Sequence, residues 1–103
     1  MTPEQAIAWA HDRGAQAHVA ASAVGKKAQI EAIAVALSFP DWFGHNLDAL
    51  YDSLTDLSWL EKGEHVLIVQ STLDGLVEDV LRDAQKRTAV SGERILKVIH
   101  TER

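Results

Sequence analysis

Apolar and polar positions follow two periods along this chain, and the changes of period divide it into seven segments. Segments in which apolar residues recur every three or four positions alternate with short runs of strand length. Connections that contain Gly, Pro or Asn separate the segments. The pattern predicts helices over Thr2–Gly14, Lys26–Ser38, Leu47–Leu57 and Leu76–Arg87, and strands over Ala15–Ala20, His65–Gln70 and Arg94–His100.

The order of these segments, α-β-α-α-β-α-β, predicts the fold class. A helix between successive strands is the usual crossover that joins parallel strands. The run HVLIVQ at His65–Gln70 is almost continuously apolar, which is typical of a strand buried on both faces. We therefore expect an α/β fold, with helices packed on a small three-stranded parallel sheet, as a single domain over residues 1–103.

Local signals predict where several segments begin and end. Thr2 and Gln5 have the spacing of a capping box, and Gly14 falls where a left-handed residue ends a helix. Pro40 is expected to end the second helix, because the residue before a proline is disfavoured in helical conformation. Asn46 is a favoured cap for the third helix.

Two weaker signals give further expectations. In the first strand, Ala17 and Val19 alternate with Gln16 and His18, which predicts one buried and one exposed face. Near the end of the chain, Thr88–Glu93 is expected to form a loop around Gly92.

The net charge draws attention to one stretch, Phe39–Glu61. This stretch contains five acids and no Lys or Arg, whereas the rest of the chain contains ten acids and ten bases. It therefore holds the whole formal charge of −5. The five acids are Asp41, Asp48, Asp52, Asp56 and Glu61.

Helical angles divide the third helix into two faces. At about 100° per residue, the leucines from Leu47 to Leu57 form one apolar stripe, while Asp48, Asp52 and Asp56 lie on the other side. Like charges four residues apart destabilise a helix by about 0.2–0.5 kcal/mol per pair, and no Lys relieves them here. The pattern predicts an exposed acidic surface whose positive counterpart comes from a basic partner.

The same residues resemble a known family. The stretch PDWFGHNLDALYDSLTDL is similar to the signature of the barstar family, intracellular inhibitors of small secreted ribonucleases, in register and without a gap. The resemblance implies a barstar-like fold and a cytoplasmic inhibitor, immunity protein or antitoxin. It further implies that the protein is a monomer and binds a basic, barnase-like ribonuclease 1:1 through the nuclease active site.

The resemblance also implies roles for individual residues. Asp52 would meet the basic residues of the nuclease, and Asp48 would pair at the rim of its site. Asp56 belongs to the same acidic face. Aromatic, loop and further acidic contacts would come from Trp42, Tyr51, Gly44, Asn46 and, on the later helix, Asp83.

The chain departs from the family pattern at a few positions. The connection Ser71–Gly75 is shorter than in the founding member, and Ser53 stands in place of a Cys. Trp59 lies two residues beyond the position of a family Trp. The N-terminal helix is an addition relative to the founding member. These departures concern the edge of the contact surface and hence the choice of partner.

Other functions remain open at this point. Asp48 and Asp52, with His45, could form an acid–base pair in an enzyme, but such pairs work in clefts that separate their pKa values. His45, Asp48 and Asp52 could instead bind a metal, although transition metals usually recruit more His. The acidic surface could also bind a basic protein other than a nuclease. We expect a non-enzymatic inhibitor without metal or cofactor.

Composition excludes further classes. The chain has no Cys and therefore no disulfide or thiolate metal site. We expect no signal peptide and no membrane span, because no apolar run approaches the length of about 20 residues that a bilayer requires. The acidic balance argues against nucleic acid as a partner.

Overall fold

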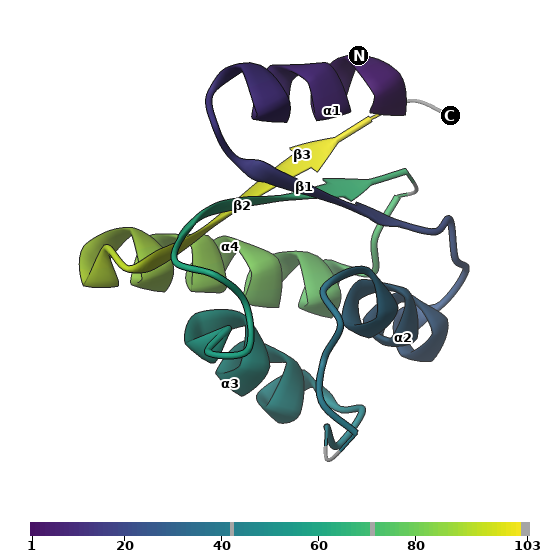
Figure 1. Ribbon diagram of the computed structural model, residues 1–103. Helices are drawn as coiled ribbons and strands as arrows, with labels where there is room; N and C mark the ends of the chain where they lie inside the picture. Colours follow the sequence, from purple (N-terminus) through teal and green to yellow (C-terminus); the bar gives the residue numbers. More distant parts are fainter. Residues whose placement is uncertain (42, 71, 102–103) are drawn as a thin grey trace.

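The computed structural model describes residues 1–41, 43–70 and 72–101, which form four helices and three strands (Figure 1). The order of these elements confirms the predicted α-β-α-α-β-α-β fold class. The helices are α1 (Pro3–Asp12), α2 (Lys26–Ala36), α3 (Leu47–Asp56) and α4 (Gly75–Ser91), and the strands are β1 (Gln16–Ala20), β2 (Gly63–Val69) and β3 (Arg94–His100).

The three strands form one parallel sheet in the order β1-β2-β3. His65 in the central strand is in register with Gln16 of β1 and with Leu96 of β3. The central strand, β2, contains the predicted run from His65 to Val69, whose residues are all buried, but begins two residues earlier and ends one residue earlier than expected. The apolar pattern of β2 therefore indicated its central position, because a middle strand that is covered on both faces needs apolar side chains on both faces.

Helices cover both faces of the sheet (Figure 1). α1 lies alone on one face, where Val66 and Ile68 of β2 pack with Ala6 and Ala10. α2 and α4 lie on the opposite face, and α3 packs mainly against α4, farther from the strands. α3 is therefore placed at the outside of the molecule.

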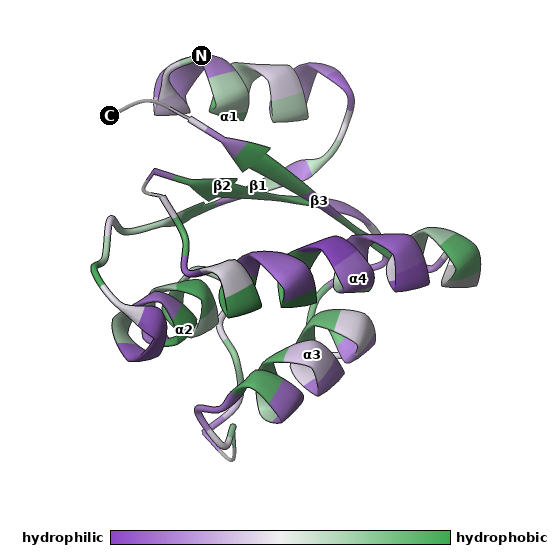
Figure 2. Cartoon of the chain, turned by 180° about the vertical axis from the view of Figure 1, so that it is seen from behind, coloured by the Kyte–Doolittle hydropathy of each residue, from purple (hydrophilic) through white to green (hydrophobic). Residues whose placement is uncertain are grey.

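The helices are amphipathic, and Figure 2 shows polar colours on the outward sides of α3 and α4 and hydrophobic colours on the strands. In the described part of the chain, no helix is both long and apolar enough to cross a bilayer. The buried faces of α2, α3 and α4 join in one core that includes Ile33, Leu50 and Leu81.

The predicted alternation in β1 is wrong in detail. Val19, expected to be buried, is 38 % exposed, whereas Ala20 is buried. The reason is that helices cover both faces of the sheet while β1 lies at its edge. Side chains of both alternating sets are therefore partly covered, and His18 is half-buried on the side of α2.

The predicted end of the last helix is also wrong. α4 continues through Thr88 and ends at Ser91, followed by Gly92 in left-handed conformation (φ 78°). The sequence predicts a loop around Gly92 from Thr88 onward, but the Thr88 hydroxyl donates to the Gln85 carbonyl and accepts from Leu96 N–H of β3. Tertiary contacts with β3 thus extend the helix by a turn.

Helix ends elsewhere follow the sequence more closely. Both hydrogen bonds of the capping box between Thr2 and Gln5 are present, and Gly14 is left-handed (φ 74°). α2 ends at Ala36, two residues earlier than expected, because Ser38 turns left-handed (φ 55°) before Pro40 is reached.

Candidate partner-binding surface

α3 has the two faces that its helical angles predict. Leu50, Leu54 and Leu57 are fully buried in the core. Asp48, Asp52 and Asp56 are all exposed on the other side. The tertiary structure therefore leaves the acidic line of α3 open to solvent.

The three aspartates are not neutralised within the chain. Among residues 1–41, 43–70 and 72–101, no Lys, Arg or His forms an ion pair with any of them. The carboxylate of Asp56 accepts a hydrogen bond of 2.9 Å from the Ser58 hydroxyl. Asp48 lies in the first turn, where the helix dipole favours a negative charge, and Asp56 lies in the last turn, where it does not.

The start of α3 is fixed by Asn46 and Gly44. The Asn46 side chain accepts a hydrogen bond of 2.8 Å from Ala49 N–H and donates one of 3.3 Å to the Gly44 carbonyl. A Cβ atom at Gly44 would lie 3.3 Å from the Asn46 amide nitrogen and 3.5 Å from the Ala49 Cβ. Asn46, predicted as a partner contact, thus also caps α3, and a side chain at Gly44, the other predicted contact, would press on Asn46.

The aromatic rings of Phe39, Phe43 and Trp59 pack together at this loop. Phe39 packs edge-on against Phe43 at 4.8 Å and against Trp59 at 5.5 Å between ring centroids. The indole N–H of Trp59 donates a hydrogen bond of 2.9 Å to the Leu37 carbonyl. Trp59 therefore ties the segment after α3 to the end of α2, a role that its sequence position did not reveal.

The two predicted aromatic contacts differ in what can be said of them. Tyr51 is half-buried and packs against the core beside the acidic line, so only part of its ring is accessible. Trp42 lies outside the residues that the structure describes.

A recess of about 310 Å³ lies beside the acidic line. Asp52 and Asp56 border it together with Gly44 and Ala49, while the buried residues Phe43 and Ser53 contribute its remaining lining. Asp48 does not line this recess, so the recess does not bring Asp48 and Asp52 together as an acid–base pair.

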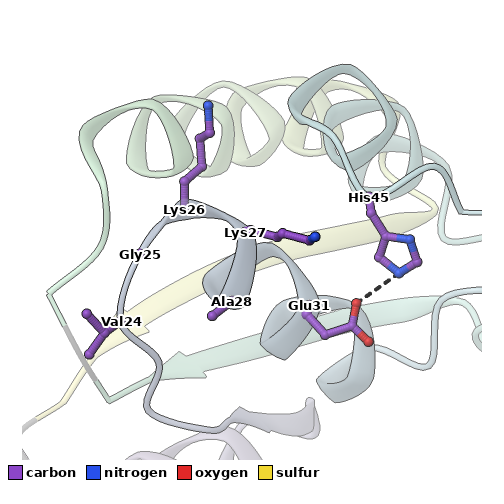
Figure 3. A pocket seen from close by; sticks show the side chains of 7 residues that line it. All are labelled: Val24, Gly25, Lys26, Lys27, Ala28, Glu31 and His45. Carbon is purple, nitrogen blue, oxygen red and sulfur yellow. Dashed lines mark ion pairs between the residues drawn. The ribbon is translucent and has the colours of Figure 1, made fainter.

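His45 is turned toward α2 and away from a metal-binding arrangement with the aspartates. Its Nε2 atom lies 2.8 Å from a carboxylate oxygen of Glu31, as Figure 3 shows beside a hollow at the start of α2. Among the described residues, no three His, Asp or Glu side chains are grouped so that they could hold a metal ion.

Asp83 lies on the exposed side of α4, the helix against which α3 packs. Unlike the aspartates of α3, it has a basic neighbour within the chain. Arg82 lies 3.8 Å from the Asp83 carboxylate and 3.1 Å from that of Asp79.

His18 of β1 and His65 of β2 form a hydrogen-bonded pair of histidines. His65 is fully buried, and its Nε2 lies 2.7 Å from the Glu61 carbonyl, which requires a proton on that nitrogen. Its Nδ1 lies 3.0 Å from His18 Nε2, and the two rings share a hydrogen bond there. Burial, and secondly the nearby His65, lower the pKa of His18 below its ordinary value, while the Ala36 carbonyl acts in the opposite direction.

Comparison with known protein families gives one match. The sequence model of the family described as Barstar (barnase inhibitor) matches residues 15–100, which include the sheet, α2, α3 and α4. No individual curated protein matches the chain. α1 precedes the matched range.

Proposed function

The chain belongs to the barstar family, and from that premise we propose that it inhibits a small basic ribonuclease of the barnase type. The inhibitor acts in the cytoplasm as a monomer and binds the nuclease 1:1. It blocks the nuclease active site with the acidic face of α3 and the loop before it. In this proposal the protein itself catalyses no reaction.

One observation carries the proposal: Asp48, Asp52 and Asp56 form an exposed acidic line that no described cation neutralises. Like charges at this spacing destabilise the helix slightly. They become favourable when a partner supplies positive charge. A ribonuclease active site does so, because it must bind the phosphates of its substrate.

The geometry suggests how the residues divide the work. Asp52 borders the recess next to Gly44, so a basic side chain of the nuclease that meets Asp52 can also contact the loop. Asp48 lies one turn nearer the start of α3 and contacts the rim of the nuclease site. Asp56 also lines the recess, and in this proposal Tyr51 and Trp42 add aromatic contact area beside the charges. Asp83 contributes from α4.

The proposal is tested by titrating the protein against barnase and against basic ribonucleases from its own source. We expect stoichiometric loss of nuclease activity with at least one of them. Asp52→Ala should weaken inhibition strongly and leave stability unchanged or slightly higher. Asp12→Ala is the matched control, because it removes the same charge from the exposed end of α1, across the sheet. If no ribonuclease is inhibited, or if both variants behave alike, the proposal fails.

Salt dependence gives a second test of the same surface. Opposite charges steer association over long range, and salt screens this attraction with a Debye length of about 10 Å at 0.1 M. The association rate with the nuclease is therefore expected to fall steeply as salt rises, while the dissociation rate changes less. An association rate that does not depend on salt would contradict an acidic docking surface.

A second candidate function is binding to a basic protein that is not a nuclease. The observation that favours it is that Asp56, the third carboxylate of the acidic line, borders the recess together with Asp52. Carboxylates can pair with any basic surface, whether or not that surface binds phosphates. A pull-down from the source organism separates the two. Capture of a basic protein without ribonuclease activity, lost in Asp52→Ala, would support this candidate.

A further inference from the structure

The loop before α3 lies between two left-handed residues. Ser38 has φ 55° and His45 has φ 53°, and neither is a glycine. Residues with a side chain rarely adopt this conformation, although His does so more readily than most. Backbone conformations of this kind persist where the surrounding contacts hold them in place.

The side chain of His45 has two contacts that can hold it. Its Nε2 lies 2.8 Å from the Glu31 carboxylate on α2 (Figure 3). Its ring packs at 64° against Phe43, with 4.9 Å between centroids. An imidazole with a proton on Nε2 donates to a carboxylate in either charge state, so the contact does not depend on protonation of the ring.

These contacts join the exposed residue Glu31 of α2 to the loop directly before α3. His45 directly precedes Asn46, the residue that caps α3. The Glu31–His45 contact therefore links α2 to the residue at which the direction of α3 is set.

We propose that His45 is a positioning residue for the partner-binding surface, which it serves by anchoring the loop and the cap of α3 to Glu31. The relevance of this anchor to binding rests on the proposed function. With the anchor in place, the free protein already holds Gly44, Asn46 and the first turn of α3 in one arrangement. A partner then has less ordering to impose on association.

The anchor is tested first in the free protein by amide hydrogen exchange. Phe43 N–H, bonded to the Pro40 carbonyl, and Ala49 N–H, bonded to the Asn46 side chain, report the loop and the cap. In Glu31→Ala and in His45→Asn, which tolerates left-handed backbone but is too short to reach Glu31, we expect these two amides to exchange about fivefold faster. Leu67 N–H in the central strand should be unchanged.

The matched control is Glu78→Ala. Glu78 and His100 form a similar exposed pair, with 2.7 Å between carboxylate and Nε2, which joins the first turn of α4 to the end of β3. This variant should leave the Phe43 and Ala49 amides as in the unmodified chain. If it accelerates them equally, or if Glu31→Ala does not accelerate them at all, the anchor is refuted.

The second arm measures association with barnase as the probe nuclease. Glu31→Ala and His45→Asn should each lower the association rate about fivefold, and the double variant should lower it no further, because both remove one contact. If His45→Asn weakens binding while Glu31→Ala does not, His45 acts by touching the nuclease, and the positioning role is refuted.

The two arms also separate this inference from the proposed function. If the unmodified protein inhibits neither barnase nor any basic ribonuclease from its own source, the proposed function is refuted. The exchange rates of Phe43 and Ala49 still decide, independently of any nuclease, whether Glu31 and His45 order the loop.

Discussion

α3 and α4 are neighbouring amphipathic helices that treat their exposed charges in opposite ways. On α4, Arg82 lies between Asp79 and Asp83 and contacts both carboxylates. On α3, Asp48 and Asp52 have no basic residue in the same helix. Charge on α4 is thus partly compensated within the helix, whereas α3 carries acidic charge without a base in the same helix, the charge that we propose a basic partner meets. The contrast distinguishes a solvated helix face from a candidate interface.

The largest expected effect concerns what the two helices share, a buried apolar face. Leu50 of α3 and Leu81 of α4 are both fully buried. Leu50→Ala and Leu81→Ala should each lower the free energy of unfolding by about 2–5 kcal/mol, through lost burial and the cavity left behind. Urea denaturation measures this. A loss well below this range for Leu50 alone would mean that α3 is not part of the core in solution.

The next effect should separate the helices by binding. Asp52→Ala is expected to weaken binding to an inhibited ribonuclease by more than about 2 kcal/mol, or roughly thirtyfold, because a basic side chain of the nuclease would be buried without the Asp52 carboxylate. Asp83→Ala should cost less than about 1 kcal/mol, since Asp83 is exposed and already has Arg82 nearby. Titration calorimetry of both variants gives the comparison. Equal losses would show that local compensation does not distinguish the helices.

Binding through α3 and through α4 can be compared at different pH values only where the protein is folded. His18 affects the pH range over which the protein stays folded. Its pKa is lowered in the folded protein, chiefly by burial, so below its ordinary value of 6.5 the unfolded chain takes up a proton that the folded protein resists. Well above that value neither state takes up the proton, so His18 adds no pH dependence there. Below it, the free energy of unfolding falls as the pH drops. Thermal unfolding should show a smaller loss between about pH 7 and pH 5 in His18→Gln. An unchanged slope would contradict the shift.

The smallest effect would make α3 resemble α4. Asp56→Lys places a cation four residues after Asp52 and in the last helical turn, where it favours both the side-chain pair and the helix dipole. The helix should gain about 0.3–0.5 kcal/mol in free energy of unfolding while inhibition becomes weaker. Thermal unfolding and nuclease titration on one preparation measure both. If stability and inhibition rise together, Asp56 does not face the partner.

Much of the fold and of the candidate surface was predictable because the signals are local. The leucine stripe and the aspartate line of α3 follow from helical spacing alone, and the caps at Thr2 and Asn46 involve residues three positions apart. The apolar run of β2 indicated a strand covered on both faces. Each of these predictions needed only the residues within one segment.

Predictions were wrong, or could not be made, where distant segments meet. Gly92 predicts a loop from Thr88 onward, whereas α4 continues to Ser91 and Leu96 of β3 donates to the Thr88 hydroxyl. The alternation in β1 predicts a buried Val19, whereas β1 lies at the sheet edge. The pair of His18 and His65 forms only because β1 and β2 are adjacent and in register. No spacing along the chain predicts such contacts.

The sequence by itself determined the seven elements, the parallel sheet and the acidic face of α3, because secondary structure and amphipathic faces arise from interactions over a few residues. Only the tertiary structure decided the order of the strands, the support of the loop by Trp59, and the contact that joins His45 to Glu31. Those features depend on how whole elements pack against one another. Packing is a collective property of the core, and it brings together side chains that the sequence keeps far apart.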